Sequence, residues 1–250
     1  MYAESVEELI RETVLEDFKA DDMILHGAGR EDIDARMLGS GRPFVAEVKV
    51  PRRRNLDLSG VERRINERCA GKVEVFCLRF VQSEMVERVK QARAEKTYRA
   101  KVLVEGFFSE DEMRSALQGI CGKIEQRTPR RVLHRRADLV RVREVKSAKL
   151  LRVEHLNGAE EAAVVEEERE KREKADEQAE KQRVRTISEI ELRCEGGLYV
   201  KELVSGDEGR TKPSLSEILG ARAYVLELDV EHVHLFFRDE ECVKEKMREF

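Results

Sequence analysis

The stretch HGAGREDIDARMLGSGRPF, from His26 to Phe44, places three acids and three arginines among four glycines. Few of its residues could fill a core, so we interpret it as a loop that contacts a ligand. Glycine permits positive φ and lets the backbone approach a ligand closely. Asp32 lies two positions from Arg30, and a neighbouring guanidinium favours an ionised carboxylate. An ionised Asp can be a nucleophile, and the arginines of the loop can hold phosphates. The alternative is a solvated turn held by ion pairs, with Asp32 capping a helix.

Outward from this loop, the sequence pattern predicts both helices and strands. Ser5 with Glu8 opens a helix to about Phe18, and Ser109 with Glu112 opens one to Ile120, since both pairs have the spacing of a capping box. Further helices are predicted at 58–69, 84–94, 214–219 and 240–250, with a short helix or extended segment at 198–205. Strands are predicted at 43–50, 73–81, 97–105 and 185–195, a long strand or a hairpin at 137–153, and two strands at 224–237. The mixture predicts an α+β fold with a mixed, mostly antiparallel sheet flanked by helices.

Charge is distributed unevenly along the chain. The segment 159–185 is rich in charged helix formers but lacks an apolar seam, so we expect an inserted charged helical arm there and not a coiled coil. The net charge of −4 over 250 residues would by itself disfavour a nucleic-acid partner. However, much of the acid lies in that arm, while RTPRRVLHRRADLVRVR, from Arg127 to Arg143, has Asp138 as its single acid. Together with the cluster at 52–54, it predicts a locally basic face.

The five cysteines are scattered without a C-x-x-C pair, which argues against a zinc site and predicts no disulfides. This usage suits a reducing cytosol, so we expect a cytoplasmic protein. No apolar run is long enough to cross a bilayer, and no signal peptide precedes the first helix. His232 and His234 share a strand face, but no third ligand is spaced nearby, so no metal site is predicted.

Three further segments follow the loop: KTYRAKVLVEG from Lys96, QRTPRRVLHRRAD from Gln126, and EGGLYVKELVSGDEGRTKPSLSEILG from Glu195. With GREDIDARMLGSGRP they resemble the archaeal and eukaryotic tRNA pseudouridine synthases that act on T-arm uridines 54 and 55. The resemblance runs from about residue 6 to residue 233. It implies a pseudouridine synthase-like catalytic domain over 1–250, with two subdomains around a central cleft and the arm at 159–185 as an insertion.

The resemblance implies an isomerase that needs no cofactor. Such an enzyme detaches uracil from C1′ of the ribose, turns it and rejoins it through C5. Carried over by motif, the catalytic carboxylate is Asp32, the aromatic beside the base is Tyr98 and the basic partner of the carboxylate is Lys201. The carboxylate would attack the nucleotide or help abstract its 2′ proton, and the sequence leaves both routes open. The uridine must leave its stack for either route.

The implied partner is the T-arm of tRNA, with no membrane and no small-molecule cofactor. We assign RNA contacts to ten basic side chains of the matching segments: Arg30, Arg36, Arg42, Arg127, Arg130, Arg131, Arg135, Arg136, Arg210 and Lys212. Each also has a structural interpretation, since Tyr98 could be an ordinary strand aromatic and the basic residues a solvated surface. Asp34 is the rival carboxylate, and the Gly-Arg-x-Asp spacing favours Asp32 over it.

Two departures from the family pattern bear on this interpretation. Family members carry an upstream RNA-binding region with a cysteine zinc site, and this sequence shows no such cysteines, so we expect either a fragment or a different mode of tRNA capture. The charged arm replaces a connection that is usually short. The alternative function is a non-catalytic T-arm RNA-binding module or tRNA chaperone on the same fold. A protein-interaction scaffold built around the arm would leave the arginines of 127–143 unexplained.

Overall fold

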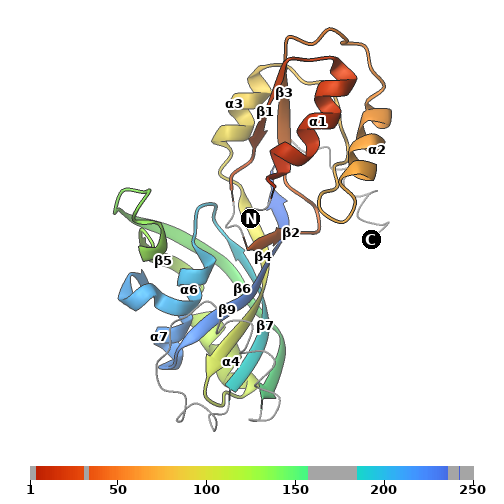
Figure 1. Cartoon of the computed structure of the whole chain (residues 1–250). Helices are drawn as coiled ribbons and strands as arrows, with labels where there is room; N and C mark the ends of the chain where they lie inside the picture. Colours follow the sequence, from red (N-terminus) through yellow and green to blue (C-terminus); the bar gives the residue numbers. More distant parts are fainter. Residues whose placement is uncertain (1–3, 31–33, 157–184, 236–241, 243–250) are drawn as a thin grey trace. The chain divides into compact units, whose positions relative to one another are not determined.

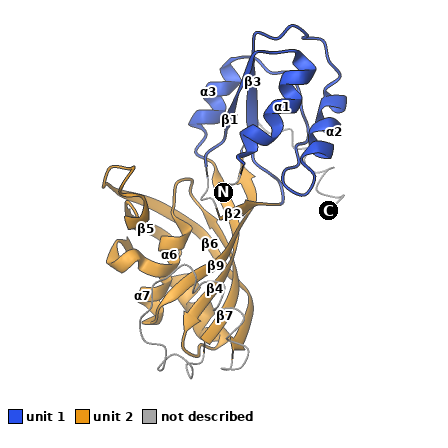
Figure 2. Cartoon of the chain, viewed as in Figure 1, with its two compact units in different colours: residues 1–31, 39–93, 235–250 blue, residues 32–38, 94–234 orange. Residues whose placement is uncertain are grey.

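The computed structural model describes residues 4–30, 34–156, 185–235 and Cys242 (Figure 1). The chain divides into two compact units (Figure 2). Unit 1 comprises residues 1–31, 39–93 and 235–250, and unit 2 comprises residues 32–38 and 94–234. The short segment 32–38 therefore belongs to unit 2, although the chain on both sides of it belongs to unit 1. One catalytic domain with a central cleft stays a prediction.

Unit 1 is built on an antiparallel pair of strands, β1 (Asp22–Gly27) and β3 (Phe44–Lys49). Three helices accompany the pair: α1 (Val6–Phe18), α2 (Leu58–Arg68) and α3 (Glu84–Gln91). The predicted capping box is confirmed, because the Glu8 backbone N–H donates to the Ser5 hydroxyl and Glu8 accepts from the Ser5 N–H. Apolar side chains of α1, α2 and β1 form the core, including the fully buried Ile10, Ile65 and Met23.

The predicted strand at 73–81 is wrong, since this segment forms no strand. Side chains of α2 satisfy its backbone groups in place of a neighbouring strand. The Asn66 amide receives the Val75 N–H at 2.7 Å and donates to the Val75 carbonyl at 2.8 Å, and the Glu62 carboxylate receives the Leu78 N–H at 3.0 Å. Cys77 has a φ of 61°, which breaks an extended conformation.

The sheet of unit 2 has seven strands in the order β2-β9-β4-β7-β6-β5-β8 (Figure 1). All neighbours are antiparallel except β2 and β9, which are parallel, so the predicted α+β class with a mostly antiparallel sheet is confirmed. The strands are β2 (Ala35–Met37), β4 (Glu95–Glu105), β5 (Gly122–Arg127), β6 (Val140–Leu156), β7 (Arg185–Cys194), β8 (Thr211–Lys212) and β9 (Ala223–His234).

The two faces of this sheet differ. Alternate residues of β4 and β7, such as Ala100 and Ile190, are fully buried, while residues between them, such as Arg99 and Glu189, form ion pairs on an open face. The buried face lies beneath helices, because α4 (Glu110–Gly119), α6 (Val200–Ser205) and α7 (Leu215–Leu219) supply buried apolar side chains. Two 3₁₀ turns, η1 (Arg130–Val132) and η3 (Gly206–Gly209), complete the described elements of the unit.

The prediction of two strands at 224–237 is wrong, because β9 is a single strand. Its register with β4 shifts at Thr97/Tyr98 and again at Lys101/Val102. Each β-bulge reverses the inside–outside alternation of side chains, which imitates a break in the sequence pattern. The same device occurs in β6, where the open choice between a long strand and a hairpin resolves to a long strand. The predicted arm at 159–185 and helix at 240–250 lie outside the described residues, Arg185 and Cys242 excepted.

The prediction of no disulfides is also wrong. Cys77 and Cys242 form a disulfide in unit 1, with their Cα atoms 6.1 Å apart. The sequence contained no sign of this pairing, because 165 positions separate the two cysteines and only the tertiary fold brings them together. Across the described ranges, no helix is long and apolar enough to span a membrane.

Candidate active site

An ion pair joins the segment before β2 to helix α6. The Lys201 ammonium donates to the Asp34 carboxylate, and the Lys201 side chain is 25% exposed against 56% for Asp34. Burial alone would raise the pKa of the Asp34 carboxyl, but the Lys201 hydrogen bond and charge, assisted by Arg131, hold that pKa below its ordinary value. Unit 2 therefore presents an ionised carboxylate two positions after Asp32 at neutral pH.

Asp32 itself lies outside the described residues. The sequence predicts Lys201 as the partner of Asp32, and the described contact of Lys201 is with Asp34 instead. Because the two carboxylates differ by two positions in one segment, the assignment of the catalytic carboxylate to Asp32 stays a prediction. The observed pair makes Asp34 a structurally supported rival.

The start of α6 is fixed by a buried glutamine. The Gln126 side chain receives the Tyr199 backbone N–H and donates to the Tyr199 carbonyl, both at 2.9 Å. Gln126 is 2% exposed and belongs to β5, so this double hydrogen bond ties the helix start to the sheet. Lys201, two residues further on, is thereby positioned by the sheet and not by a flexible loop.

Tyr98 occupies the middle of the sheet. It stands in β4 between Leu192 of β7 and Val230 of β9 in the strand register, and it is 3% exposed. Its face is the one that the helices cover, which is also the face of Ala100. This placement gives Tyr98 a packing role, and a role beside the reacting base stays a prediction.

Carboxylates engage several arginines of the predicted RNA-binding segment. Arg131 donates to Glu202 through Nε at 2.6 Å, and the Glu202 side chain is 6% exposed. Arg127 and Arg210 share Asp138, whose carboxyl pKa burial would raise but these two guanidiniums hold below its ordinary value. Arg130 pairs with Glu208 of η3. These pairs fasten the connection between β5 and β6 to the helices that follow β7.

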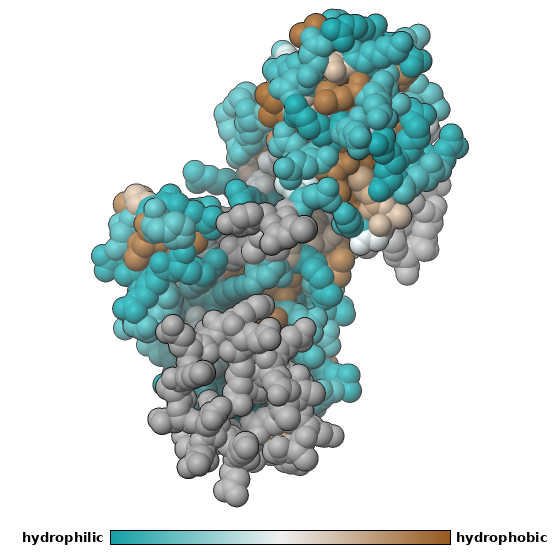
Figure 3. All heavy atoms as spheres, viewed as in Figure 1, coloured by the Kyte–Doolittle hydropathy of each residue, from teal (hydrophilic) through white to brown (hydrophobic). Residues whose placement is uncertain are grey.

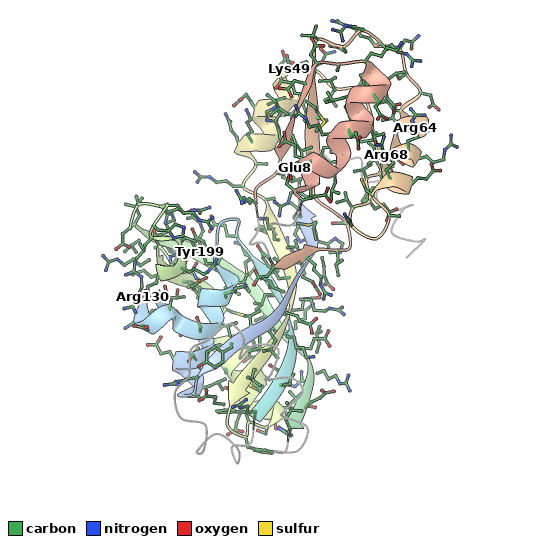
Figure 4. The ribbon with its side chains drawn as sticks, viewed as in Figure 1. Glu8, Lys49, Arg64, Arg68, Arg130 and Tyr199 are labelled. Carbon is green, nitrogen blue, oxygen red and sulfur yellow. A yellow bond between two sulfur atoms is a disulfide. The ribbon has the colours of Figure 1, made fainter. Side chains whose placement is uncertain are left out.

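Sequence reasoning missed Tyr199. The Arg136 guanidinium donates to the Tyr199 hydroxyl at 2.7 Å, and the guanidinium carbons of Arg136 and Arg131 lie 5.9 and 6.0 Å from the centre of its ring. Figure 4 labels Tyr199 in this part of unit 2, together with Arg130. An aromatic ring with guanidiniums close to it is typical of surfaces that bind nucleobases and phosphates. Its position inside the GLYVK motif was the available signal.

The remaining predicted contact residues are dispersed. Arg36 of β2 donates to both carboxylate oxygens of Asp229, at 2.6 and 2.8 Å, and so is held to β9. Arg30 and Arg42 belong to unit 1, where Arg42 donates to the Gly29 carbonyl. Arg135 and Lys212 are exposed in unit 2. The rings of His232 and His234 are 5.9 Å apart, and the described residues contain no cluster of ligands for a metal ion.

Taken together, unit 2 is an α+β fold with an ionised carboxylate beside an arginine-rich, tyrosine-containing surface, which suits a protein that handles nucleic acid. Comparison with known families agrees with this class. The chain belongs to the family described as Pus10, C-terminal, whose model matches residues 1–166 and 163–234. The resemblance stated from the sequence motifs is thereby confirmed.

Curated relatives extend the comparison. The chain is 52% identical over 230 residues to the tRNA pseudouridine synthase Pus10 of Methanothrix thermoacetophila, covering 92% of this chain and 44% of that protein. It is 45% identical over 229 residues to the protein of the same name from Archaeoglobus fulgidus, covering 92% and 55%. The chain thus spans about half the length of the curated relatives it matches.

Solved structures show more distant similarity. One similar structure is a chain of a Cbf5-Nop10-Gar1 complex, with a TM-score of 0.49 and 15% identity. The match covers 96% of the present chain and 48% of the chain in that complex. The archaeal box H/ACA sRNP Nop10-Cbf5 complex matches 94% of this chain over 45% of its own, with a TM-score of 0.43 and 14% identity.

Proposed function

We propose that this chain is the catalytic region of a tRNA pseudouridine synthase that converts uridine to pseudouridine in the T-arm, at position 54, position 55 or both. Its membership of the Pus10 C-terminal family and the shared name of its relatives support the proposal. The observation that carries it is the Asp34–Lys201 pair, because it keeps a carboxylate of the GREDID segment ionised beside the arginine-rich surface. Such an enzyme would act in the cytoplasm, where tRNA is modified and used.

The reaction needs no redox partner, since substrate and product are isomers. The bond between N1 of uracil and C1′ of the ribose breaks, a bond between C5 and C1′ forms, and the proton lost from C5 is balanced by the proton gained at N1. We propose Asp32 as the carboxylate that attacks the nucleotide or assists removal of its 2′ proton. Lys201 would keep the carboxylates of this segment ionised, and Tyr98 would support the base.

For tRNA capture, we retain the ten basic residues named from the sequence as proposed contacts. Four of them fit a phosphate ligand best, because within the described ranges Arg30, Arg135, Arg136 and Lys212 form no ion pair with a carboxylate, whereas Arg130 and Arg131 do. Arg136 also carries the tyrosine contact, so it could hold a phosphate while Tyr199 faces a base.

The test is to incubate the purified chain with an unmodified tRNA transcript and to map pseudouridine by carbodiimide treatment and primer extension. A stop at position 54, 55 or both, absent without protein, is the expected result. A chain that binds the transcript but yields no stop would instead be an RNA-binding module, the alternative from the sequence. Neither binding nor product would refute both functions.

A further inference from the structure

The hairpin of β5 and β6 turns two arginines toward the start of α6. In its antiparallel register Gln126 stands opposite Arg141, and Ile124 stands opposite Arg143. Residues directly opposite each other in such a pair project to the same face. Because Ile124 and Gln126 are buried, and Gln126 bonds the Tyr199 backbone, that face is the one on which α6 begins. Arg141 and Arg143 therefore lie on the same side of the hairpin as Tyr199.

Arg143 lies against a glycine turn. A Cβ atom built on Gly197 would be 3.4 Å from Arg143 Nε, and Gly197 has a φ of 88°, which a side chain would strain. The guanidinium donates through Nη1 to the Val142 carbonyl at 2.7 Å, while its Nε is buried without a hydrogen-bond partner in the described structure. Burying a donor without an acceptor costs free energy, so a ligand that accepts a hydrogen bond from Arg143 Nε would be favoured.

Arg141 has hydrogen bonds but only to uncharged groups. Its Nη1 donates to the Thr128 hydroxyl at 2.9 Å and lies 3.5 Å from the Leu139 carbonyl. Within residues 4–30, 34–156 and 185–235, neither Arg141 nor Arg143 forms an ion pair with a carboxylate, whereas Arg127, Arg130 and Arg131 each do. The chain has 52 acids and 48 bases, so carboxylates are plentiful, yet none in the described ranges neutralises these two half-buried guanidiniums. Because an unpaired buried charge is unfavourable, the pair is expected to bind an anionic ligand.

We propose that Arg141 and Arg143 form a phosphodiester-binding subsite for the RNA backbone next to the nucleotide under reaction. The proposal rests on the function proposed above. Guanidinium groups bind phosphate oxygens through paired, charge-assisted hydrogen bonds, which would satisfy the buried Nε of Arg143. Residues two positions apart on a strand are separated by about 7 Å, so the pair extends along a line and suits a polymer of phosphates better than one free anion.

The experiment measures the dissociation constant of the unmodified tRNA transcript for the full 250-residue chain as a function of salt concentration. In the double variant Arg141→Gln/Arg143→Gln, we expect the slope of log Kd against log salt to fall by about 0.7–0.9 for each lost phosphate contact. The matched control is Arg152→Gln/Arg193→Gln, because these two arginines of β6 and β7 pair with Glu154 and Glu95. Its slope should equal that of the wild type.

A second measurement avoids substitution effects on folding. The side-chain Nε–H resonance of Arg143, assigned by its loss in Arg143→Lys, should shift when RNA is added to the otherwise wild-type chain. An unshifted resonance, or equal slopes in the two double variants, would overturn the subsite. Pseudouridine mapping on the same preparations separates the two proposals. Product from the wild type with equal slopes refutes the subsite alone, while unequal slopes without product refute the catalytic function alone.

Discussion

Units 1 and 2 both carry many arginines, and these arginines differ in whether a carboxylate of the chain already pairs with them. In unit 1, arginines of α2 brace helix against helix, since Arg64 pairs with Asp17 and Arg68 pairs with Glu12 and Glu16 (Figure 4). In unit 2, Arg127, Arg130 and Arg131 are likewise paired, whereas Arg141 and Arg143 have no carboxylate partner among the described residues. Arg143 also lies beside a glycine turn. The difference shows that the density of basic residues does not identify a nucleic-acid surface. What matters is whether the protein has already supplied the counter-charge.

The surface hollows of the two units also differ in the polarity of the side chains that line them. Unit 1 contains a groove of about 1040 Å³ lined largely by apolar side chains of α1, β3 and the segment 74–90. Unit 2 contains a hollow of about 240 Å³ on the open face of its sheet, lined by charged residues such as Arg99, Glu189 and Asp229. Figure 3 accordingly shows a mainly hydrophilic surface interrupted by apolar patches. Unit 1 adds a disulfide and ion pairs between helices to its apolar core, whereas unit 2 combines a buried sheet face with ion pairs on the open face.

The largest expected effect is that of removing a carboxylate from the segment 32–38 of unit 2, which tests whether this unit carries out the proposed reaction. Asp32→Ala should abolish pseudouridine formation while leaving the affinity for tRNA within a few-fold, because the carboxylate acts in the reaction and the arginines act in binding. Asp34→Ala should retain activity, although at a reduced level. The measurement is product mapping together with tRNA titration for both variants. Activity that survives in Asp32→Ala and disappears in Asp34→Ala would transfer the catalytic role to the carboxylate that Lys201 contacts.

The second prediction concerns the disulfide of unit 1. Cys77→Ser should lower the free energy of unfolding by about 2–5 kcal/mol under oxidising conditions, because the cross-link restricts the unfolded chain. In a reducing buffer, the wild type should unfold like the variant. Thiol titration of the denatured, unreduced wild type should detect three free cysteines, Cys69, Cys121 and Cys194. Five free thiols would show that the bond does not form, and unit 1 would then have no disulfide to distinguish it from unit 2.

The third prediction separates a buried ion pair from an exposed one within unit 2. Arg131→Ala leaves the Glu202 carboxylate buried without its counter-ion, and should destabilise the chain by about 2–3 kcal/mol, below the 3–5 kcal/mol of a fully buried pair because Arg131 is partly exposed. Arg130→Ala removes an exposed pair and should change stability by under about 1 kcal/mol. Urea unfolding of both variants checks the difference, and equal losses would contradict it.

The smallest effect concerns the pH dependence of the Asp34–Lys201 pair. The pKa of Asp34 is held below its ordinary value of 3.8, so the pair stabilises the fold at neutral pH and is lost as the pH falls through that lowered pKa. Asp34→Asn should therefore cost under about 1 kcal/mol at pH 7, since the carboxylate is more than half exposed. Urea titrations from pH 7 downward should show the two proteins converging only below pH 3.8. Convergence at a higher pH would argue against the depressed pKa.

Local signals in the sequence predicted the helices well. The capping boxes at Ser5 and Ser109 involve residues three positions apart, and both form as expected. The strands predicted at 43–50, 97–105 and 185–195 are also confirmed, but other strand predictions failed because they depend on partners distant in the sequence. The segment 73–81 forms no strand because the side chains of Asn66 and Glu62 bond its backbone groups instead of a neighbouring strand. The strand β2 was not predicted, because its three residues form a strand only through pairing with β9.

For the candidate site, the sequence predicted which segments come together but not which arginines are already neutralised by carboxylates. The motif placed Lys201 near the GREDID segment, and the structure brings Lys201 to that segment at Asp34. The pattern of arginines indicated a basic surface, but it could not separate Arg131, which neutralises a buried glutamate, from Arg143, which has no counter-ion in the described chain. That distinction depends on residues some 50 to 70 positions away, which no local window contains.

The parallel pairing of β2 with β9 has a consequence for how the molecule is made. Arg36 and Asp229 are 193 positions apart in the chain, so their contact joins distant parts of the sequence. During synthesis, β2 leaves the ribosome before β9 and has no strand to join until β9 follows. Contacts of such long range form late in folding. A chain interrupted before β9 would therefore leave β2 without its partner strand, so the segment that contains Asp34 reaches its folded position only after β9 has been made.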